Sequence, residues 1–340
     1  MTARQYAAAG VDLTALDAAK RRIASSVEST RTALSRGLVG AFGGMIRVPE
    51  GLRQPLLVMS TDSVGTKVLV ARMAGVFTGV GEDIVNHSVN DILVHGARGI
   101  AFQDYIGSNG LTEGQLADIV EGVSRGCRAH GMALTGGETA SLPDIYAPGD
   151  YDLAGTIVGV VEETAALHGD RITPGDVLVG YLSSGLHTNG YTLARKICFD
   201  RLKLTADSRV SELGTTIAEA LLAVHRSYFR ALEPVLDRVH GIAHITGGGI
   251  AGNLVRVLPP DTEAVIDAGS WQWPPLFTFL MDAGRVSVQE MREVFNIGVG
   301  LLVAIPPKEV DRVREAARDG GIETWIAGEV RAGQRGVRFT

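Results

Sequence analysis

Length, composition and charge exclude several classes of protein. A chain of 340 residues is too long for one ordinary core, and 45% hydrophobic with 21% charged residues is typical of a globular protein in two domains. A net charge of −6 without a basic cluster argues against a nucleic-acid-binding surface. No apolar run is long enough for a membrane span or a signal peptide, and two isolated cysteines favour free thiols, so we expect a cytoplasmic protein.

The first half of the chain alternates apolar runs with amphipathic segments. A helix is expected over 112–130, with Thr112 as its N-cap and Gly131 at its end. The remaining pattern predicts a helix over 83–95 and strands over 56–61, 100–106, 132–135 and 151–161.

A polar segment with Pro174 and Gly175, residues 168–176, predicts a domain boundary. We therefore expect domains over 1–168 and 169–340. In the second, the pattern predicts a strand over 177–182, a helix from Tyr191, a long helix over about 211–239, a strand, glycine turn and helix over 241–258, helices over 277–281, 288–295 and 308–317, and strands over 300–305 and 324–330. The fold class is mixed α/β.

The stretch "STDSVGTK", residues 60–67, follows the first predicted strand. Asp62 could hold Mg²⁺ and Lys67 could meet a phosphate, with Gly65 and Thr66 in the turn between them. The alternative, that Asp62 and Ser63 only satisfy turn amides, is favoured by this stretch alone. Neither a Walker loop nor a G-x-G-x-x-G dinucleotide motif is present.

The predicted helix over 83–95 carries an unusual polar stripe. Charged surface helices usually use Glu, Lys and Arg, which are good helix formers. This stripe consists of poor helix formers, which indicates a face kept for binding: Asp83, Asn86, His87, Asn90 and Asp91.

"TGGETA", residues 135–140, places Glu138 after Gly136 and Gly137 at the end of a predicted strand. If strand and helix ends meet, Asp62, Asp91 and Glu138 would form a carboxylate cluster suited to Mg²⁺ on nucleotide phosphates. The alternative is an isolated turn with Glu138 in water.

Two glycine turns in the second half are candidate anion sites, because each joins a predicted strand to a helix N-terminus. Plain strand-to-helix turns remain the alternative. His130, His225 and His240 have no evident partner and are expected to be structural or exposed, and Trp271 and Trp273 to pack under a helix. The turns carry Ser183, Ser184, His187, Thr188 and Asn189, and Thr246, Gly247, Gly248 and Gly249.

Taken together and in this order, the motifs resemble the phosphoribosylformylglycinamidine cyclo-ligase (aminoimidazole ribonucleotide synthetase) family. The chain departs from the family pattern at Leu186, Gly252 and Val255. The matching stretches are "YAAAGVD" (6–12), "GAFGG" (40–44), "TDSVGTK" (61–67), "SVNDIL" (88–93), "TGGETA" (135–140), "YDLAG" (151–155), "SSGLHTNGY" (183–191), "HITGGG" (244–249), "SWQWP" (270–274) and "FNIGVG" (295–300).

The resemblance implies a homodimer in which the sheets of two N-terminal domains form a barrel, each followed by a C-terminal α/β domain. It also implies ATP-dependent closure of formylglycinamidine ribonucleotide to aminoimidazole ribonucleotide, with release of ADP and phosphate. A related small-molecule kinase, a nucleotide-binding regulator and a scaffold remain rival interpretations.

The resemblance also implies roles for individual residues. Mg²⁺ is expected on Asp62, Asp91 and Glu138, with K⁺ as a further candidate ion, and His187 is expected to transfer a proton or bind an oxyanion. Asp62 and Lys67 complete the expected catalytic group, and the two glycine turns of the second half bind the substrate. The expected ATP and phosphate contacts are Gly65, Thr66, Lys67, Asn90, Gly136 and Gly137.

Overall fold

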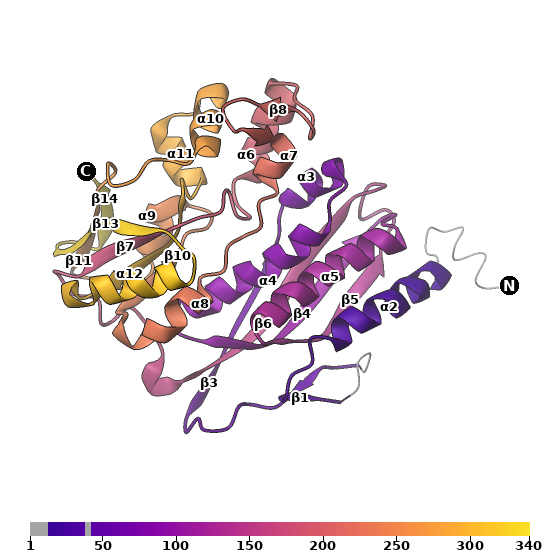
Figure 1. Ribbon diagram of the computed structural model, residues 1–340, viewed down its shortest axis with the longest axis horizontal. Coiled ribbons are helices and arrows are strands. Elements are labelled where there is room, and N and C mark those ends of the chain that lie inside the picture. Colours follow the sequence, from indigo (N-terminus) through magenta and orange to yellow (C-terminus); the bar gives the residue numbers. More distant parts are fainter. Residues whose placement is uncertain (1–12, 38–41) are drawn as a thin grey trace.

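The computed structural model describes residues 13–37 and 42–340, arranged as two lobes joined side by side (Figure 1). The stretch 6–12 and part of 40–44, both quoted for the resemblance, lie outside the described residues. We call the part up to residue 162 the first lobe and the part from residue 177 the second lobe. In the described part of the chain, no helix combines the length and the apolar character needed to cross a membrane.

The first lobe is built on a four-stranded sheet in the order β3-β6-β4-β5. Only β4 and β5 are parallel. The strands are β3 (Pro55–Ser63), β4 (Arg98–Ser108), β5 (Ala133–Ser141) and β6 (Tyr151–Glu162), and a short hairpin precedes them, β1 (Ser35–Arg36) and β2 (Met45–Ile46).

Helices cover one face of this sheet. α4 (Thr78–Leu93) packs on β3, β4 and β6, α5 (Glu113–Ala129) packs beside it, and α2 (Leu13–Glu28) lies against α5. The capping box that Thr112 forms with Gln115 confirms the predicted start of α5. Within residues 13–37 and 42–340, no helix covers the other face (Figure 1): Leu57 on β3 is 52% exposed and Met59 is 66% exposed.

The second lobe is a three-layer α/β unit. Its sheet has the order β10-β12-β7-β13-β11-β14, in which only β11 and β14 are parallel. The strands are β7 (Val177–Leu182), β10 (Gly241–His244), β11 (Thr262–Ile266), β12 (Val299–Ile305), β13 (Thr324–Ala332) and β14 (Gly336–Phe339).

Helices cover both faces of the second sheet, as Figure 1 shows. Alternate residues of β7 and β12 face opposite cores, which explains why these strands are apolar throughout. One face packs against α8 (Phe229–Leu232), the 3₁₀ turn Glu233–Arg238 and α12 (Val310–Asp319). The other packs against α6 (Tyr191–Arg195), α7 (Ile217–Leu221), α9 (Gly249–Leu254), α10 (Pro275–Gly284) and α11 (Val288–Val294).

Two predictions about elements were wrong. The long helix expected over 211–239 is broken into α7, an irregular segment over 222–228 and α8. The segment leaves the helical path because its backbone groups bind side chains of α4 instead. The glycines of "TGGETA" do not form a turn either, because β5 continues through them beside β4.

Candidate functional site

A cleft of about 450 Å³ lies between the two lobes. The first lobe contributes the end of β3, including Ser60 and Asp62, and the end of α4 with the turn that follows it, from His87 to His95. The second lobe contributes β10 and the glycine turn that follows it, with Thr246, Asn253 and Arg256. Asp62 and the polar face of α4 therefore lie side by side, and β10 with its glycine turn faces them from the second lobe.

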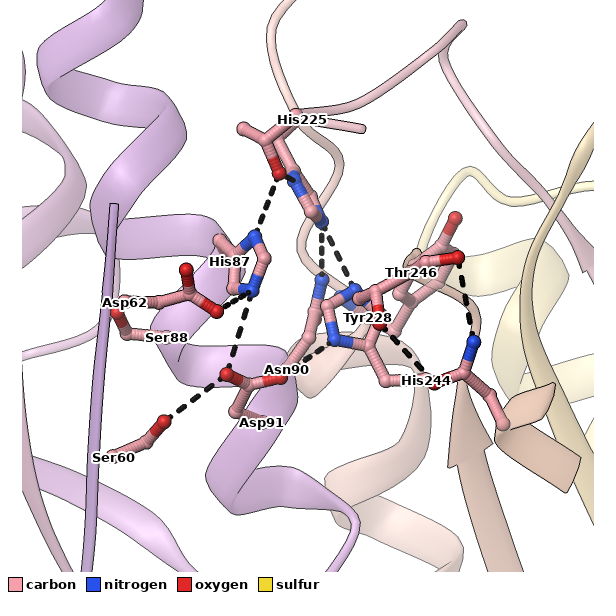
Figure 2. A network of polar contacts seen from close by, with 12 residues as sticks. Ser60, Asp62, His87, Ser88, Asn90, Asp91, His225, Tyr228, His244 and Thr246 are labelled. Atoms are coloured by element: carbon pink, nitrogen blue, oxygen red, sulfur yellow. Dashed lines mark hydrogen bonds and ion pairs between the residues drawn. The ribbon is translucent and has the colours of Figure 1, made fainter. Parts of the chain in front are cut away.

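Two carboxylates of the first lobe converge on one imidazole. His87 Nε2 lies 2.8 Å from Asp62 Oδ2 and 3.4 Å from Asp91 Oδ2 (Figure 2). The four-residue spacing on α4 places His87 and Asp91 on the same helix face. Ser60 Oγ donates a hydrogen bond of 3.1 Å to Asp91 Oδ2. Asp62 and Asp91 are therefore neighbours, as the sequence predicted.

The charges in this group are strongly coupled. Burial alone lowers the pKa of His87, but the hydrogen bonds and negative charges of Asp62 and Asp91 outweigh it and raise that pKa to about 9. Burial tends to raise the pKa of Asp91, but hydrogen bonds from His244 and His87 bring it well below the usual range. At neutral pH the group thus holds two carboxylates around an imidazolium.

The second lobe reaches this group through His244 at the end of β10. Its Nδ1 lies 2.9 Å from Asp91 Oδ1, so Asp91 is held by both lobes. On the far side, His244 Nε2 lies 3.2 Å from His225 Nε2, and the ring of His187 stacks on His225 with centroids 4.0 Å apart. Burial and neighbouring positive charges hold the pKa of His225 and His187 well below the usual value, so both are neutral.

Sequence reasoning missed His225 and His244. His225 was expected to lack a partner, yet it is fully buried and lies between Thr188, Asn90 and His244. No local signal identified it, because the surrounding segment resembled a helix. His244 had a signal: it ends a strand directly before a glycine turn, as Asp62 does in the first lobe.

Most of the polar stripe on α4 joins the lobes rather than facing the cleft. Asn86 Nδ2 donates to His225 O at 2.8 Å, and Asp83 Oδ1 accepts from His225 N at 2.7 Å. Asn90 donates to Arg226 O at 2.8 Å and accepts from Tyr228 N at 3.0 Å. The expected contact of Asn90 with a nucleotide phosphate finds no support here, because its amide is engaged on both sides.

Lys67 is also part of the joint between the lobes. Its side chain is 0% exposed, and Nζ lies 2.8 Å from Asp83 Oδ2. The ammonium donates its remaining hydrogen bonds to the carbonyl oxygens of His187 and Ala223. The geometry does not support the expected phosphate contact, because all three donors are used inside the protein.

Glu138 does not join Asp62 and Asp91 within one chain. Across the sheet, Asp62 pairs with Gly155, Gly155 with Asp104, and Asp104 with Gly137. Three strand spacings separate Asp62 from this part of β5, roughly 14 Å. Glu138 is exposed on the edge strand, and Gly136 and Gly137 lie beside it in the same strand.

His187 is enclosed. Only 1% of it is exposed, and its Nε2 accepts a hydrogen bond of 3.2 Å from the backbone N–H of Ser184. Proton transfer from this ring to a ligand in the cleft is therefore not supported by its position. Ser184 and Ser183 are likewise bonded internally, Ser184 to Val224 O and Ser183 to Asn296.

The glycine turns lie in two different places. Thr246 is in the cleft, where its Oγ1 donates to Asn253 Oδ1 at 3.1 Å, and the turn continues through Gly247, Gly248 and Gly249 into α9. Gly65 and Thr66 line a separate pocket of about 490 Å³. Its lining also includes Thr188, Asn189, Tyr191, Thr192, Lys196 and Glu290.

Known proteins share this architecture. Residues 44–161 match the family described as AIR synthase related protein, N-terminal domain, and residues 173–339 match its C-terminal domain. Among solved structures, thiamine-monophosphate kinase from Stenotrophomonas maltophilia superposes with a TM-score of 0.70 at 17% identity, covering 95% of each chain. The hydrogenase maturation protein HypE in complex with ATP superposes with a TM-score of 0.63 at 19% identity, over 92% of this chain and 86% of that chain. The fold and the cleft thus define an AIR synthase-related protein.

Closer relatives specify the branch. A protein of Sorangium cellulosum named phosphoribosylformylglycinamidine cyclo-ligase is 46% identical over 96% of this chain and 94% of its own. One of Symbiobacterium thermophilum with the same name is 44% identical over 97% and 96%. The chain belongs to the phosphoribosylformylglycinamidine cyclo-ligase family.

Proposed function

We propose that the protein closes the imidazole ring of aminoimidazole ribonucleotide from formylglycinamidine ribonucleotide, with conversion of ATP to ADP and phosphate. The names of the close relatives support this reaction, and the complex of HypE with ATP supports a nucleotide site in this fold. The observation that carries the proposal is the convergence of Asp62 and Asp91 at the cleft between the lobes.

The residues present fit a magnesium ion in part. Asp62 and Asp91 offer the hard oxygen ligands that Mg²⁺ prefers, and both approach the same imidazole nitrogen. A bound magnesium ion would offset negative charge on the nucleotide phosphates. Glu138 lies on the opposite edge of the sheet, so any contact of this residue with the same ion requires a second subunit.

The reaction begins with activation of the substrate's formamide group. The formamide oxygen attacks the γ-phosphorus of ATP, and ADP leaves. The ring-forming nitrogen then attacks the formamide carbon, and after loss of a proton the C–O bond breaks to release phosphate. Nucleophile and electrophile belong to one molecule, so much of the rate comes from orientation in the cleft. Substrate binding in the cleft is assigned to the turn 246–249, where Arg256 adds a cation. The turn 183–190, proposed as a second substrate contact, reaches the separate pocket of about 490 Å³ through Thr188 and Asn189.

The proposal includes a cytoplasmic homodimer. The helix-free face of the first-lobe sheet exposes Leu57 and Met59, an apolar surface that a second copy would bury. The two described cysteines, Cys127 and Cys198, are buried and free, which fits a reducing compartment.

The decisive experiment measures ADP and aminoimidazole formation from ATP and formylglycinamidine ribonucleotide. Asp62→Asn and Asp91→Asn should each lower the rate at fixed magnesium by about 10-fold or more and raise the magnesium requirement. Asp237→Asn, an exposed acid outside the cleft, is the matched control. A stable phosphorylated product without cyclisation would instead identify a kinase.

A further inference from the structure

The hydrogen bonds of Asn90 fix the protonation pattern of the histidines beside it. Its Oδ1 accepts from Tyr228 N and its Nδ2 donates to Arg226 O, so the amide orientation is determined by backbone groups. The same Nδ2 lies 3.2 Å from His225 Nε2, which makes that nitrogen an acceptor. His225 therefore carries its proton on Nδ1, which faces Thr188 Oγ1 at 3.4 Å.

His244 also faces two partners. Its Nε2 lies 3.2 Å from His225 Nε2, and its Nδ1 lies 2.9 Å from Asp91 Oδ1. A neutral imidazole carries one proton, so His244 can donate at one of these two contacts and faces its other partner with a lone pair. A cation on Nδ1, either a second proton or a metal ion, makes both contacts favourable at once.

The surroundings of this position match a transition-metal site. One ligand atom each from His87, Asp91 and His244 lies within 4.8 Å of the other two. Ligands of a tetrahedral zinc ion lie about 3.3 Å from one another, given bonds of about 2.0 Å. The separations of Asp91 Oδ1 from His244 Nδ1 and of Asp91 Oδ2 from His87 Nε2 are 2.9 and 3.4 Å, close to this value.

The far nitrogen of each imidazole is already held. His87 Nδ1 bonds Thr188 Oγ1 at 2.7 Å, and His244 Nε2 bonds His225. Metal-binding histidines are normally oriented in this way by a partner on the other ring nitrogen. Asp62 Oδ2, 2.8 Å from His87 Nε2, places a further carboxylate beside this group.

We propose that His87, Asp91 and His244, with Asp62, form a site for a divalent transition-metal ion such as Zn²⁺, which bridges the two lobes. Imidazole nitrogens suit Zn²⁺, Co²⁺ or Ni²⁺, whereas Mg²⁺ prefers an all-oxygen shell. The site shares Asp62 and Asp91 with the proposed magnesium site, so a transition metal would compete there with magnesium. Binding itself depends on neither nucleotide nor turnover.

The test titrates chelator-treated full-length protein with Co²⁺ in the absence of nucleotide and substrate. We expect one equivalent to bind with the visible absorption of nitrogen and oxygen ligation, Zn²⁺ to displace it, and Zn²⁺ to raise Tm because the unfolded chain lacks the assembled site. His87→Gln and His244→Asn keep an amide nitrogen near the lost ring nitrogen, so each should keep the fold and weaken Co²⁺ binding more than about 10-fold.

His168→Gln, which removes an exposed histidine outside the cleft, is the matched control and should bind Co²⁺ normally. Absence of Co²⁺ absorption, or Zn²⁺ binding no tighter than Mg²⁺, would show that only a proton occupies the position and would overturn the proposal. Equal binding by His244→Asn and the unmodified protein would overturn it as well. Failure of ring closure in the separate assay would leave these readings unchanged, so the two proposals fail independently.

Discussion

Lys67 Nζ in the first lobe lies 2.8 Å from Asp83 Oδ2, and neither side chain is exposed. The same ammonium donates to Ala223 O of the second lobe at 2.8 Å. An ion pair without solvent therefore lies where the lobes meet, and its lysine is the residue that the sequence assigned to phosphate binding.

Replacing Lys67 should mainly destabilise the protein. Lys67→Met leaves the Asp83 carboxylate buried without its partner, which costs about 3–5 kcal/mol in the free energy of unfolding, and adding Asp83→Asn should recover part of this loss. Urea unfolding followed by circular dichroism measures both. Full stability of Lys67→Met together with a raised KM for ATP would instead make Lys67 a phosphate ligand.

His87 should make the chelator-treated protein less stable at alkaline pH. Its pKa is raised from 6.5 to about 9 by Asp62 and Asp91 against the effect of burial. The unfolded state loses this proton near pH 6.5, so the stabilisation is complete below that pH and disappears as the pH rises to about 9. The change is on the order of 3 kcal/mol. Urea unfolding between pH 6 and 10 tests it, and His87→Gln should flatten this part of the profile.

Asp104 should also make the protein less stable as the pH rises, but here the cause is burial of the carboxyl group rather than an ion pair. Burial raises the pKa of this carboxyl group to about 7, and no ion pair with a cation opposes the effect among the described residues. The folded protein then holds a proton that the unfolded chain releases near pH 4, so stability falls between pH 4 and 7. Asp104→Asn should be neutral at pH 4 and stabilising at pH 8 in thermal unfolding. An equal effect at both pH values would refute this origin.

The helix-free face of the first-lobe sheet predicts self-association. Leu57→Glu places a charge on that face, which a dimer would bury without a partner. Because an unpaired buried charge is costly, the dissociation constant of the dimer should rise by roughly tenfold or more. Met73→Glu on α3 (Lys67–Ala74), 47% exposed away from this sheet, is the control. Sedimentation equilibrium of both variants distinguishes them, and identical behaviour would place the interface elsewhere.

Local patterns predicted the regular elements well because burial and capping act over short distances. Thr112 begins α5 as expected, and the strand over 177–182 has the predicted bounds. The segment 222–228 failed because its backbone is bonded by Asn86, Asn90 and Asp83 from another lobe, a long-range interaction that no local propensity encodes.

The candidate site was predictable in part for a similar reason. Asp62 lies at the end of a strand and Asp91 lies on the polar face of a helix, and both positions can be recognised from the local sequence pattern. Glu138 was grouped with them by residue type, but strand order decides distance, and β3 and β5 occupy opposite edges of the sheet. The partners of His225 could be recognised only from the contacts between the two lobes.

The bonds that α4 makes to segment 222–228 also limit how the protein can move. Opening the cleft by a hinge would break the Asn86, Asn90 and Asp83 bonds together with the hydrogen bonds from Lys67 Nζ to His187 O and Ala223 O. Such a concerted rupture is far costlier than rotation of a side chain or displacement of a turn. Ligand exchange should therefore occur through rearrangement of the exposed turns at the rim, while the two walls keep a constant separation throughout the catalytic cycle.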